Sequence, residues 1–549
     1  MLRASTLLLG LWAFVMLLIS LSFISTKPVV QPAPQRYNVL FIATDDWKPM
    51  AGCYRSAGAG TPQIQTPNID RLAGQGTVFM RNYCQQAVCA PTRASLLTGQ
   101  RPDYTRVWDL QTQIRAMNPA ILTMPQYFRQ QGYVTTGIGK IFDYRSVDKG
   151  DDSLSWSVPY HRLSKTDYPN GFEMPLRGLY QNPQTRKGIE QYMAEAATKG
   201  IAAGMPRQRY AQERLSPVDE SEAIPDGAYT DGAIARKSQQ IIKELAGQKG
   251  PNATGGRPTR PFFFAVGFRS PHLPFVTPKK YWDLYDRSKL NLAVYQQKSI
   301  NPADVAYQAS GELNNQYTGT RGEKFGKGFD PKPDSVQRRL IHGYYASVSY
   351  MDAQIGLLLD ELKANGLDKN TIVVLWGDHG WHLGDHGMWC KHTNFEQATR
   401  APLIITAPGF RANQKTESLS EFVDVFPTLC ELTGLKMPDA LAGKSLVSVL
   451  RKPNQLVKNY AVSQYPRNGD KVMGYAIRTD RYRYVAWFEQ DFRKNRVMAD
   501  MKPIATEFYD YQKDPNETRN AVAEAGYQAV VNQHAQLLRE FLQNQTQSH

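Results

Sequence analysis

Residues 37–46, YNVLFIATDD, are an unbroken apolar run that ends in the adjacent aspartates Asp45 and Asp46. Three later runs share this plan: residues 132–143 (GYVTTGIGKIFD) contain Lys140, residues 261–272 (PFFFAVGFRSPH) end at His272, and residues 370–381 (NTIVVLWGDHGW) contain Asp378 and His379. Continuous apolar runs of this kind predict parallel strands that are covered on both faces of a sheet.

Helical segments separate the apolar runs, among them residues 67–76 (PNIDRLAGQG), 121–132 (ILTMPQYFRQQG) and 345–366 (YASVSYMDAQIGLLLDELKANG). Strands that alternate with helices predict an α/β fold, with a large, mostly parallel sheet and helices on both faces. Ligands of such folds bind beyond the carboxyl ends of the strands. We therefore expect the polar ends of the four runs to lie on one rim of the sheet.

Two regions differ from this alternation. Residues 144–260 are rich in Gly, Pro, Gln and charge, which predicts a long excursion over the surface that would line a substrate cleft. Residues 456–549 contain alternating strands and an amphipathic helix near the end, which predicts a small antiparallel sheet with a terminal helix. We accordingly divide the chain into a catalytic domain, residues 37–455, and a C-terminal subdomain, residues 456–549.

The N-terminus indicates export. One arginine precedes an uncharged apolar run over residues 7–24, so residues 1–26 are expected to be a signal peptide or an N-terminal anchor. No Ala-x-Ala cleavage site stands out, and both alternatives remain open. A Pro-rich linker, residues 27–36, follows. We expect a periplasmic or extracellular protein, either free or anchored in the membrane through residues 7–24.

The 549-residue chain carries 65 Lys and Arg against 50 Asp and Glu, a formal net charge of +15. Such an excess favours polyanions, including sulfated or carboxylated sugars, nucleic acids and anionic membranes. Nucleic acid is not expected as a partner, because no basic run is interleaved with aromatic residues. The five cysteines are too few for a disulfide scaffold; one bridge is possible, and at least one cysteine is free or modified.

The aspartates point to a metal site. Asp45, Asp46 and Asp378 would bring three carboxylates together, and such charges repel one another unless a cation neutralises them. Oxygen ligands favour calcium or magnesium, and His379 is a further candidate ligand. A zinc site is disfavoured, because the histidine-rich segment 378–392 lacks a helix-borne HExxH pattern. The alternative is that one of the two adjacent aspartates only caps a turn.

Four positive or titratable side chains are expected on the same rim: Arg93, Lys140, His272 and Lys391. A tetrahedral oxyanion such as sulfate or phosphate needs charge neutralisation and an acid that protonates the leaving oxygen. Each of these residues alone is more often a solvated side chain. Their joint position on one rim favours a binding site.

Cys89 is the second residue of the stretch VCAPTRASLLTGQRP, residues 88–102. A phosphatase-type Cys-x5-Arg loop is excluded, because position 95 is Ser95, and Cys84 and Cys89 lack zinc-finger partners. Pro91 near the first turn predicts a helix that starts here, and the N-terminus of a helix favours an anion.

The motif Cys-x-Pro-x-Arg, followed by Leu-Thr-Gly in CAPTRASLLTGQRP, resembles the signature of the sulfatases whose cysteine is converted to formylglycine. The resemblance covers about residues 38–520 and is nearest to the iduronate sulfatase branch. It rests on segments such as FIATDDWKP, TPNIDRLA, GFRSPHLPF and GDHGWHLGDHGMWCKH. It implies the alkaline-phosphatase-like sulfatase fold and hydrolysis of a sulfate ester.

The resemblance also implies a nucleophile and a metal site. A formylglycine-generating or other sulfatase-maturing enzyme would convert Cys89 to formylglycine, whose hydrated aldehyde attacks sulfur. The sulfated hydrate would then collapse to aldehyde and free sulfate, which splits one difficult step into two. One calcium ion would be held by Asp45, Asp46, Asp378, His379 and the converted Cys89.

The remaining implied roles concern the sulfate. Arg93 would steady the hydrate, and Lys140, His272 and Lys391 would bind the sulfate, with His272 or Lys391 as proton donor to the leaving alcohol. One position departs from the family pattern. A histidine usually follows the lysine within two or three residues and takes the proton during sulfate release, whereas Asp143 stands here. Asp143 would act as that base or face the substrate.

A sulfated saccharide that contains a uronic acid is the expected substrate. Two other functions stay open. The first is a phosphoester or phosphonate hydrolase of the same superfamily, although two lysines and a histidine around one metal favour sulfate. The second is a non-catalytic binder of sulfated glycans in which Cys89 is never converted, although an intact motif beside intact metal carboxylates argues against it.

Overall fold

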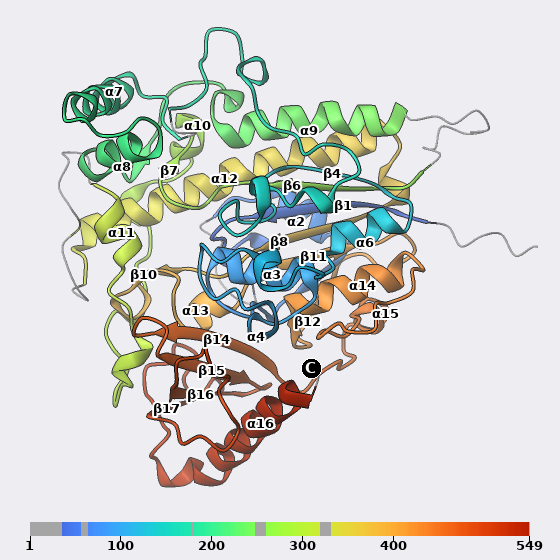
Figure 1. Cartoon of the computed structure of the whole chain (residues 1–549), viewed down its shortest axis with the longest axis vertical. Helices are drawn as coiled ribbons and strands as arrows, with labels where there is room; N and C mark the ends of the chain where they lie inside the picture. The colour runs from blue at the N-terminus through green and yellow to red at the C-terminus, as the bar shows by residue number, and fades with distance from the viewer. Residues whose placement is uncertain are drawn as a thin grey trace, which may run out of the picture. The chain divides into compact units, whose positions relative to one another are not determined.

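Four parallel strands form one half of a seven-stranded sheet with the order β12-β2-β11-β8-β1-β6-β4, and β4 is an edge strand (Figure 1). They are β8 (Thr371–Gly377), β1 (Asn38–Thr44), β6 (Phe262–Gly267) and β4 (Val134–Gly139). These strands are the four apolar runs of the sequence, and their parallel pairing confirms the predicted α/β fold. The structure, a computed structural model, describes residues 36–55, 64–176, 179–247, 260–318, 325 and 331–547.

The other half of the sheet is mixed. β11 (Leu403–Thr406) runs antiparallel to β8 and to β2 (Thr77–Phe79). The edge strand β12 (Gln414–Thr416) runs parallel to β2. These strands are short, and no long apolar run marks them in the sequence.

Helices cover both faces of this sheet (Figure 1). Leu40 and Ile42 of β1 pack in one hydrophobic cluster with α2 (Pro67–Ala73), α9 (Thr230–Gly247) and α12 (Asp334–Ala364). Val39 and Phe41 pack in a second cluster, on the opposite face, with α3 (Cys89–Thr98), α6 (Met124–Gln130) and α14 (Val425–Leu432). Burial on both faces explains why β1 has no polar residue between Val39 and Ala43.

Three α-helices lie in the described part of the region 144–260. α7 (Pro183–Thr198) and α8 (Met205–Arg214) pack on each other, away from the central sheet (Figure 1). α9, in contrast, buries one side against the sheet and α12. The region that we expected to be a surface excursion therefore includes a core helix, which the polar residues on the exposed side of α9 concealed.

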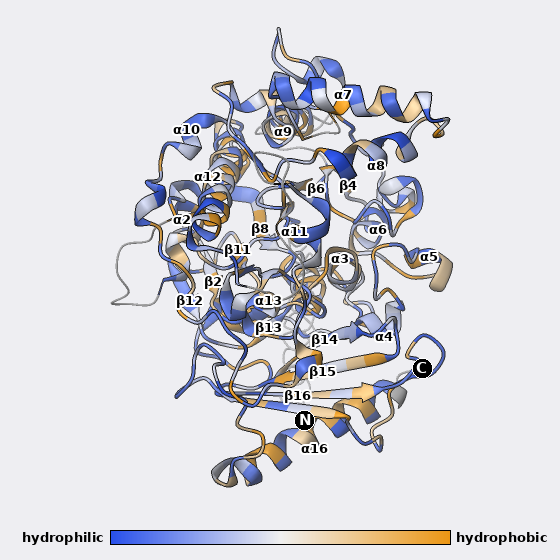
Figure 2. Ribbon diagram, turned by 90° about the vertical axis from the view of Figure 1, so that its left-hand side faces the viewer, coloured by the Kyte–Doolittle hydropathy of each residue, from blue (hydrophilic) through white to orange (hydrophobic). Residues whose placement is uncertain are grey.

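The predicted C-terminal antiparallel sheet and terminal helix are confirmed. The sheet has the order β14 (Ala461–Arg467), β15 (Val472–Arg478), β16 (Tyr482–Glu489) and β17 (Ala505–Asp510). α16 (Gln528–Gln547) lies along one face of it (Figure 2). Residues Tyr37–His549 form one compact unit, so the sheet belongs to the same unit as the rest of the fold.

A buried ionic cluster joins this sheet to the helix α13 (Glu396–Thr399). The guanidinium of Arg483 on β16 lies 2.5 Å from Glu396 Oε2 and 3.6 Å from Glu517 Oε1. Glu517 Oε2 accepts a hydrogen bond of 3.0 Å from the backbone N–H of Glu396. Burial raises the pKa of Glu517 to about 7, although the charge of Arg483 acts to lower it.

The N-terminal expectations fall largely outside the structure. The signal peptide or anchor, residues 1–26, and the linker up to residue 35 lie outside the described residues. Among the residues that are described, none of the helices has the length and apolar character needed to cross a membrane. The five cysteines are all described, and each is a free thiol.

Candidate active site

The carboxyl ends of the four parallel strands are level with one another. Thr44 at the end of β1 pairs with Gly377 at the end of β8. Gly139 at the end of β4 pairs with Gly267 at the end of β6. The next residues after these ends include Asp45, Asp378 and Lys140, and the register therefore places their side chains at one edge of the sheet.

Gly139 allows the turn that puts Lys140 at this edge. Its φ of +81° lies in the left-handed region, and a Cβ there would lie 2.0 Å from the carbonyl oxygen of Gly267. A side chain at this position would meet backbone on the neighbouring strand.

A fully buried arginine links three of the strand ends. Arg93 Nε lies 3.1 Å from Asp378 Oδ2, and Arg93 Nη2 lies 3.1 Å from Asp45 Oδ1. The same guanidinium donates to the backbone carbonyl oxygens of Thr44 and Ile141, at 3.1 Å each. The guanidinium of Arg93 is thus held in one position, because it donates hydrogen bonds to three strand ends at once.

Asp46 lies at the centre of the site. Its φ of +61° is uncommon for an aspartate and turns the carboxylate toward the neighbouring groups. Lys391 Nζ lies 2.9 Å from Asp46 Oδ2, and His379 Nε2 lies 3.3 Å from Asp46 Oδ1. Burial raises the pKa of Asp46 to about 7, while Lys391 and His379 act to lower it. Asp46 thus belongs to a cluster and does not merely cap a turn.

Cys89 is the first residue of α3 and is 2% exposed. Its Sγ lies 3.7 Å from His379 Nε2 and 4.0 Å from Asp46 Oδ1. Burial, together with the charge of Asp45, holds the pKa of the Cys89 thiol well above its usual range. The thiol is therefore protonated at neutral pH and is a poor nucleophile in this form.

The described residues fit a divalent cation. One ligand atom from each of Asp46, Cys89, Asp378 and His379 lies within 4.8 Å of the others, and the same holds for Asp45, Cys89 and His272. Buried carboxylates at this spacing need positive charge between them. Oxygen-rich ligands with one histidine suit a hard divalent ion.

The two lysines predicted to lie on the rim contact the same carboxylates. Lys140 Nζ lies 2.7 Å from Asp45 Oδ2, just as Lys391 contacts Asp46. Lys391 is held between two acids, and their charges keep its pKa well above the usual range despite burial. Both lysines are therefore ammonium ions at the rim.

Asp143, the residue found where the family pattern has a histidine, forms a two-pronged ion pair. Arg145 Nε and Nη2 each donate to its carboxylate at 2.8 Å, and Lys140 Nζ lies 3.7 Å away. Burial acts to raise the pKa of Asp143, but the hydrogen bonds from Arg145 and the charge of Lys140 lower it below the usual range. A carboxylate in this state is a weak base.

Glu312 is a site residue that the sequence did not indicate. It lies on the short helix α11 (Gly311–Gln316) and approaches the site from outside the strand ends. Its carboxylate lies 2.7 Å from Lys391 Nζ and 3.2 Å from Nε2 of both His272 and His392. α11 follows no apolar run and carries no motif, so no sequence signal was available.

His272 completes the rim. Its Nε2 lies 3.7 Å from Asp46 Oδ2, and its Nδ1 donates to the carbonyl oxygen of Leu273. Burial and the charge of Lys391 lower the pKa of His272 to about 4. The ring is therefore neutral at neutral pH, and because Nδ1 carries the proton, Nε2 carries the lone pair.

The other histidines of segment 378–392 have separate roles. His382 Nε2 pairs with Thr393 Oγ1 at 2.9 Å, and His386 stacks on Phe395 with ring centroids 4.5 Å apart. Neither belongs to the groups of possible metal ligands among the described residues. His382 and His386 thus contribute a hydrogen bond and ring packing to this segment, whereas His379 is a possible metal ligand.

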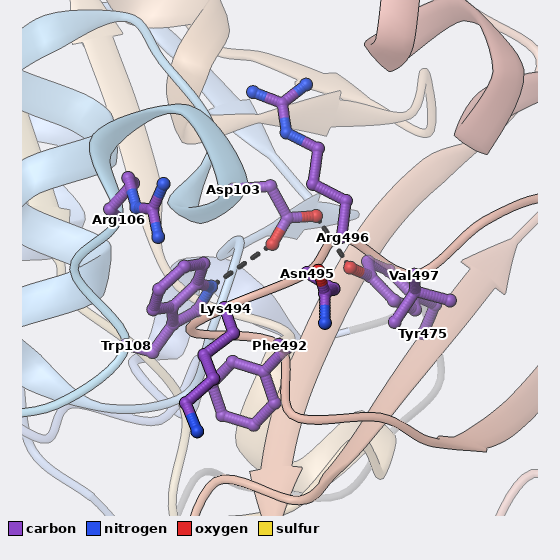
Figure 3. Close-up of a pocket in the computed structure, with 9 residues that line it drawn as sticks. All are labelled: Asp103, Arg106, Trp108, Tyr475, Phe492, Lys494, Asn495, Arg496 and Val497. Atoms are coloured by element: carbon purple, nitrogen blue, oxygen red, sulfur yellow. Dashed lines mark hydrogen bonds between the residues drawn. The ribbon is translucent and has the colours of Figure 1, made fainter.

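A hollow lies where α4 (Pro102–Thr105) meets the C-terminal sheet (Figure 3). Asp103 accepts hydrogen bonds from Trp108 Nε1 at 3.1 Å and from the Tyr475 hydroxyl at 2.6 Å. The side chains of Arg496 and Lys494 point away from one another (Figure 3). The cations do not converge, and the hollow is a seam between two packed elements.

A rim of ammonium groups above clustered carboxylates suits an enzyme that hydrolyses esters of a tetrahedral oxyanion. Residues 37–435 match the family model described as Sulfatase, and residues 384–545 match N-sulphoglucosamine sulphohydrolase, C-terminal. The chain belongs to the sulfatase family and is a sulfuric ester hydrolase, as the sequence predicts.

Relatives support the predicted iduronate sulfatase branch. The chain is 32% identical to iduronate 2-sulfatase of Mus musculus, over 89% of this chain and 91% of that protein. Identity to the same enzyme of Homo sapiens is also 32%, over 88% and 90%. An ulvan-active sulfatase of Formosa agariphila is 26% identical, over 94% and 84%.

Solved structures confirm the predicted alkaline-phosphatase-like sulfatase fold. A protein in complex with its substrate D-glucosamine-2-N,6-O-disulfate has a TM-score of 0.66 and 21% identity, over 94% of this chain and 99% of that one. A phosphonate monoester hydrolase of Agrobacterium radiobacter has a TM-score of 0.65 and 23% identity, over 94% and 96%. At these identities the likeness concerns the fold alone.

Proposed function

We propose that this enzyme hydrolyses a sulfate ester on a sulfated, uronic-acid-containing saccharide, with Cys89 converted to formylglycine and one calcium ion bound beside it. The observation that carries the proposal is the convergence on Cys89 of the Asp46 carboxylate and the His379 ring, beside the buried guanidinium that holds Asp45 and Asp378. The 32% identity to iduronate 2-sulfatases supports the substrate class.

The state of the thiol supports conversion of Cys89. A buried, protonated thiol next to carboxylates is neither a good nucleophile nor paired in a disulfide. The converted side chain would supply an oxygen nucleophile directed at sulfur. The rest of the site would then position the ester and move the protons.

Asp45, Asp46, Asp378 and His379 would hold the calcium ion together with the converted Cys89. When bound, the ion would neutralise the carboxylates and polarise the sulfate group. In the structure, Lys140 contacts Asp45 and Lys391 contacts Asp46. A cation at the carboxylates would satisfy that charge and free both ammonium groups to bind the sulfate of the substrate.

We assign proton donation to the leaving alcohol to Lys391. Its ammonium is held protonated by Asp46 and Glu312, whereas His272 is neutral above about pH 4. The lone pair on His272 Nε2 would instead take a proton from the converted Cys89 during sulfate release. Asp143 is bound by Arg145, so we propose that it holds Arg145 and Lys140 in place.

The proposal includes partners and a location. A formylglycine-generating or other sulfatase-maturing enzyme would act on the Cys-x-Pro-x-Arg motif. Export through residues 1–26 would bring the enzyme to the periplasm or the medium, where sulfated polysaccharides occur, with residues 7–24 as a signal or an anchor. The net charge of +15 favours such polyanionic substrates.

The test is to express the full chain with and without a formylglycine-generating enzyme and to weigh the peptide that contains Cys89. We expect turnover of sulfated uronic acid disaccharides to rise in proportion to the converted fraction. Cys89→Ala is the matched control and should bind the sugar without turnover. Full activity in a chain whose Cys89 is still a thiol would contradict the mechanism, and faster turnover of phosphate analogues would favour a phosphoester hydrolase.

A further inference from the structure

A hollow of about 330 Å³, part of which is open solvent, lies beside His272. Its walls include the side chains of Tyr229, Leu273 and Val276, and its lining also contains Arg269 and His272. His272 belongs to both the sulfate rim and this hollow. A substrate whose sulfate contacts His272 therefore extends from the rim toward the hollow.

A buried carboxylate fixes the turn that carries both polar side chains. Asp231, at the start of α9, is 3% exposed and accepts hydrogen bonds of 2.8 Å from the backbone N–H groups of Arg269 and Ser270. The backbone N–H of His272 donates to the carbonyl oxygen of Arg269 at 2.9 Å. The spacing between Arg269 and His272 is thus set by the backbone.

The guanidinium of Arg269 differs from the other cations near the site. Arg93, Lys140, Arg145 and Lys391 each contact a carboxylate within 3.1 Å. Arg269 is half-buried, and within the described part of the chain its guanidinium forms no hydrogen bond or ion pair. A guanidinium presents a fork of donors that matches an acidic group in a two-pronged manner.

We propose that Arg269 binds a second acidic group of the saccharide, a carboxylate or a further sulfate, while the scissile sulfate lies on the rim. Tyr229, Leu273 and Val276 would pack against the apolar face of the sugar ring. This inference rests on the proposed function, because it assumes a saccharide sulfate on the rim. It assigns a role in substrate selection to a residue outside the reacting centre.

The test compares Arg269→Ala with Arg209→Ala, a control at an exposed position on α8. Four substrates are used: a sulfated uronic acid disaccharide, its carboxyl-reduced form, its form without the second sulfate, and a simple aryl sulfate. In Arg269→Ala we expect KM for the disaccharide to rise about 10–100-fold with kcat nearly unchanged. Turnover of the aryl sulfate should not change.

The two modified disaccharides identify the acidic group. Whichever group Arg269 binds, its removal should raise KM of the wild-type enzyme by the same factor and should not raise KM of Arg269→Ala further. An equal loss on the aryl sulfate would overturn the proposal, as would an unchanged KM for every substrate. Calorimetric binding to Cys89→Ala, with and without Arg269→Ala, gives a second readout that does not need turnover. Failure of the wild-type enzyme on every sulfate ester would instead refute the proposed function.

Discussion

The ammonium of Lys391 lies 2.7 Å from Oε2 of Glu312, and this ion pair brings an acid from outside the strand ends into the site. Lys391 is at most 3% exposed, so its charge is stabilised by the two carboxylates that flank it. Glu312 thus orients the residue that we propose as the proton donor.

Replacing Glu312 by glutamine tests this role. The amide keeps the size of the side chain but removes the charge that holds Lys391 and contacts His272 and His392. We expect kcat/KM to fall about 10–100-fold, as is usual for residues that orient a catalytic group. Glu213→Gln, at an exposed position, is the control. Unchanged kinetics and an unchanged pH profile in Glu312→Gln would argue against the role.

Replacing Lys391 by methionine should affect substrates unequally. General acid catalysis contributes about 10²–10⁴-fold and matters most when the leaving group is a poor one. We expect a loss of this size for a sugar sulfate and a much smaller loss for an aryl sulfate, whose leaving group needs no proton. His272→Ala is the comparison and should lower both rates by similar factors. Equal losses in Lys391→Met would contradict proton donation by Lys391.

Metal removal should change stability in a pH-dependent way. Burial raises the pKa of Asp46 to about 7 in the folded chain, above its ordinary value of 3.8. A raised carboxyl pKa stabilises the fold below about pH 4, and this contribution is lost as pH rises through 7. We therefore expect the metal-free protein to lose stability between pH 4 and 7. Calcium should raise Tm more at pH 8 than at pH 5.

Thermal unfolding with chelator and with calcium, from pH 5 to 8, checks this expectation. Asp46→Asn removes the titrating group and should flatten the pH dependence of the metal-free protein. Calorimetry with inorganic sulfate should also show tighter binding when calcium is present, because calcium frees Lys140 and Lys391. Sulfate binding that does not depend on calcium would contradict that part of the proposal.

The cluster between the C-terminal sheet and α13 predicts a second pH dependence. Burial raises the pKa of Glu517 from 4.5 to about 7, and its contribution is present below pH 4.5 and is lost as pH rises through 7. Glu517→Gln should remove roughly 1–3 kcal/mol of this variation in the free energy of unfolding. Urea unfolding at several pH values measures it, with Glu489→Gln on β16 as control. A slope unchanged from wild type would show that Glu517 does not titrate in this range.

The central fold could be predicted because β1, β4, β6 and β8 are long and buried on both faces. Their parallel pairing then places Asp45, Lys140 and Asp378 at one edge of the sheet. The proximity of these three residues could therefore be predicted from the fold. The short strands β2, β11 and β12 left no comparable signal. The sequence signal of β14 is also weak, because its sequence AVSQYPR contains a proline and little alternation.

The residues that the sequence did not indicate come from loops and short helices. Glu312 reaches the site from α11, and Arg269 is held at its hollow because Asp231 accepts hydrogen bonds from the backbone N–H groups of Arg269 and Ser270. Their positions depend on how distant segments pack, which no local pattern records. Arg145, in contrast, lies only two residues after Asp143 in the chain. Its hydrogen bonds to the Asp143 carboxylate make that carboxylate a weak base.

The covering of Cys89 has a consequence for the order of events during synthesis. The Ser463 hydroxyl of β14 donates to the carbonyl oxygen of Cys84, and the two residues are 379 positions apart in the chain. The strand that contacts the loop before Cys89 is thus made long after the cysteine itself. We expect a maturing enzyme to reach Cys89 only in that interval, and a chain that has already folded with its thiol should stay unconverted when the enzyme is added afterwards. The specific activity of a preparation would then depend on how quickly the maturing enzyme reached each chain during synthesis, as well as on how much of the protein folded.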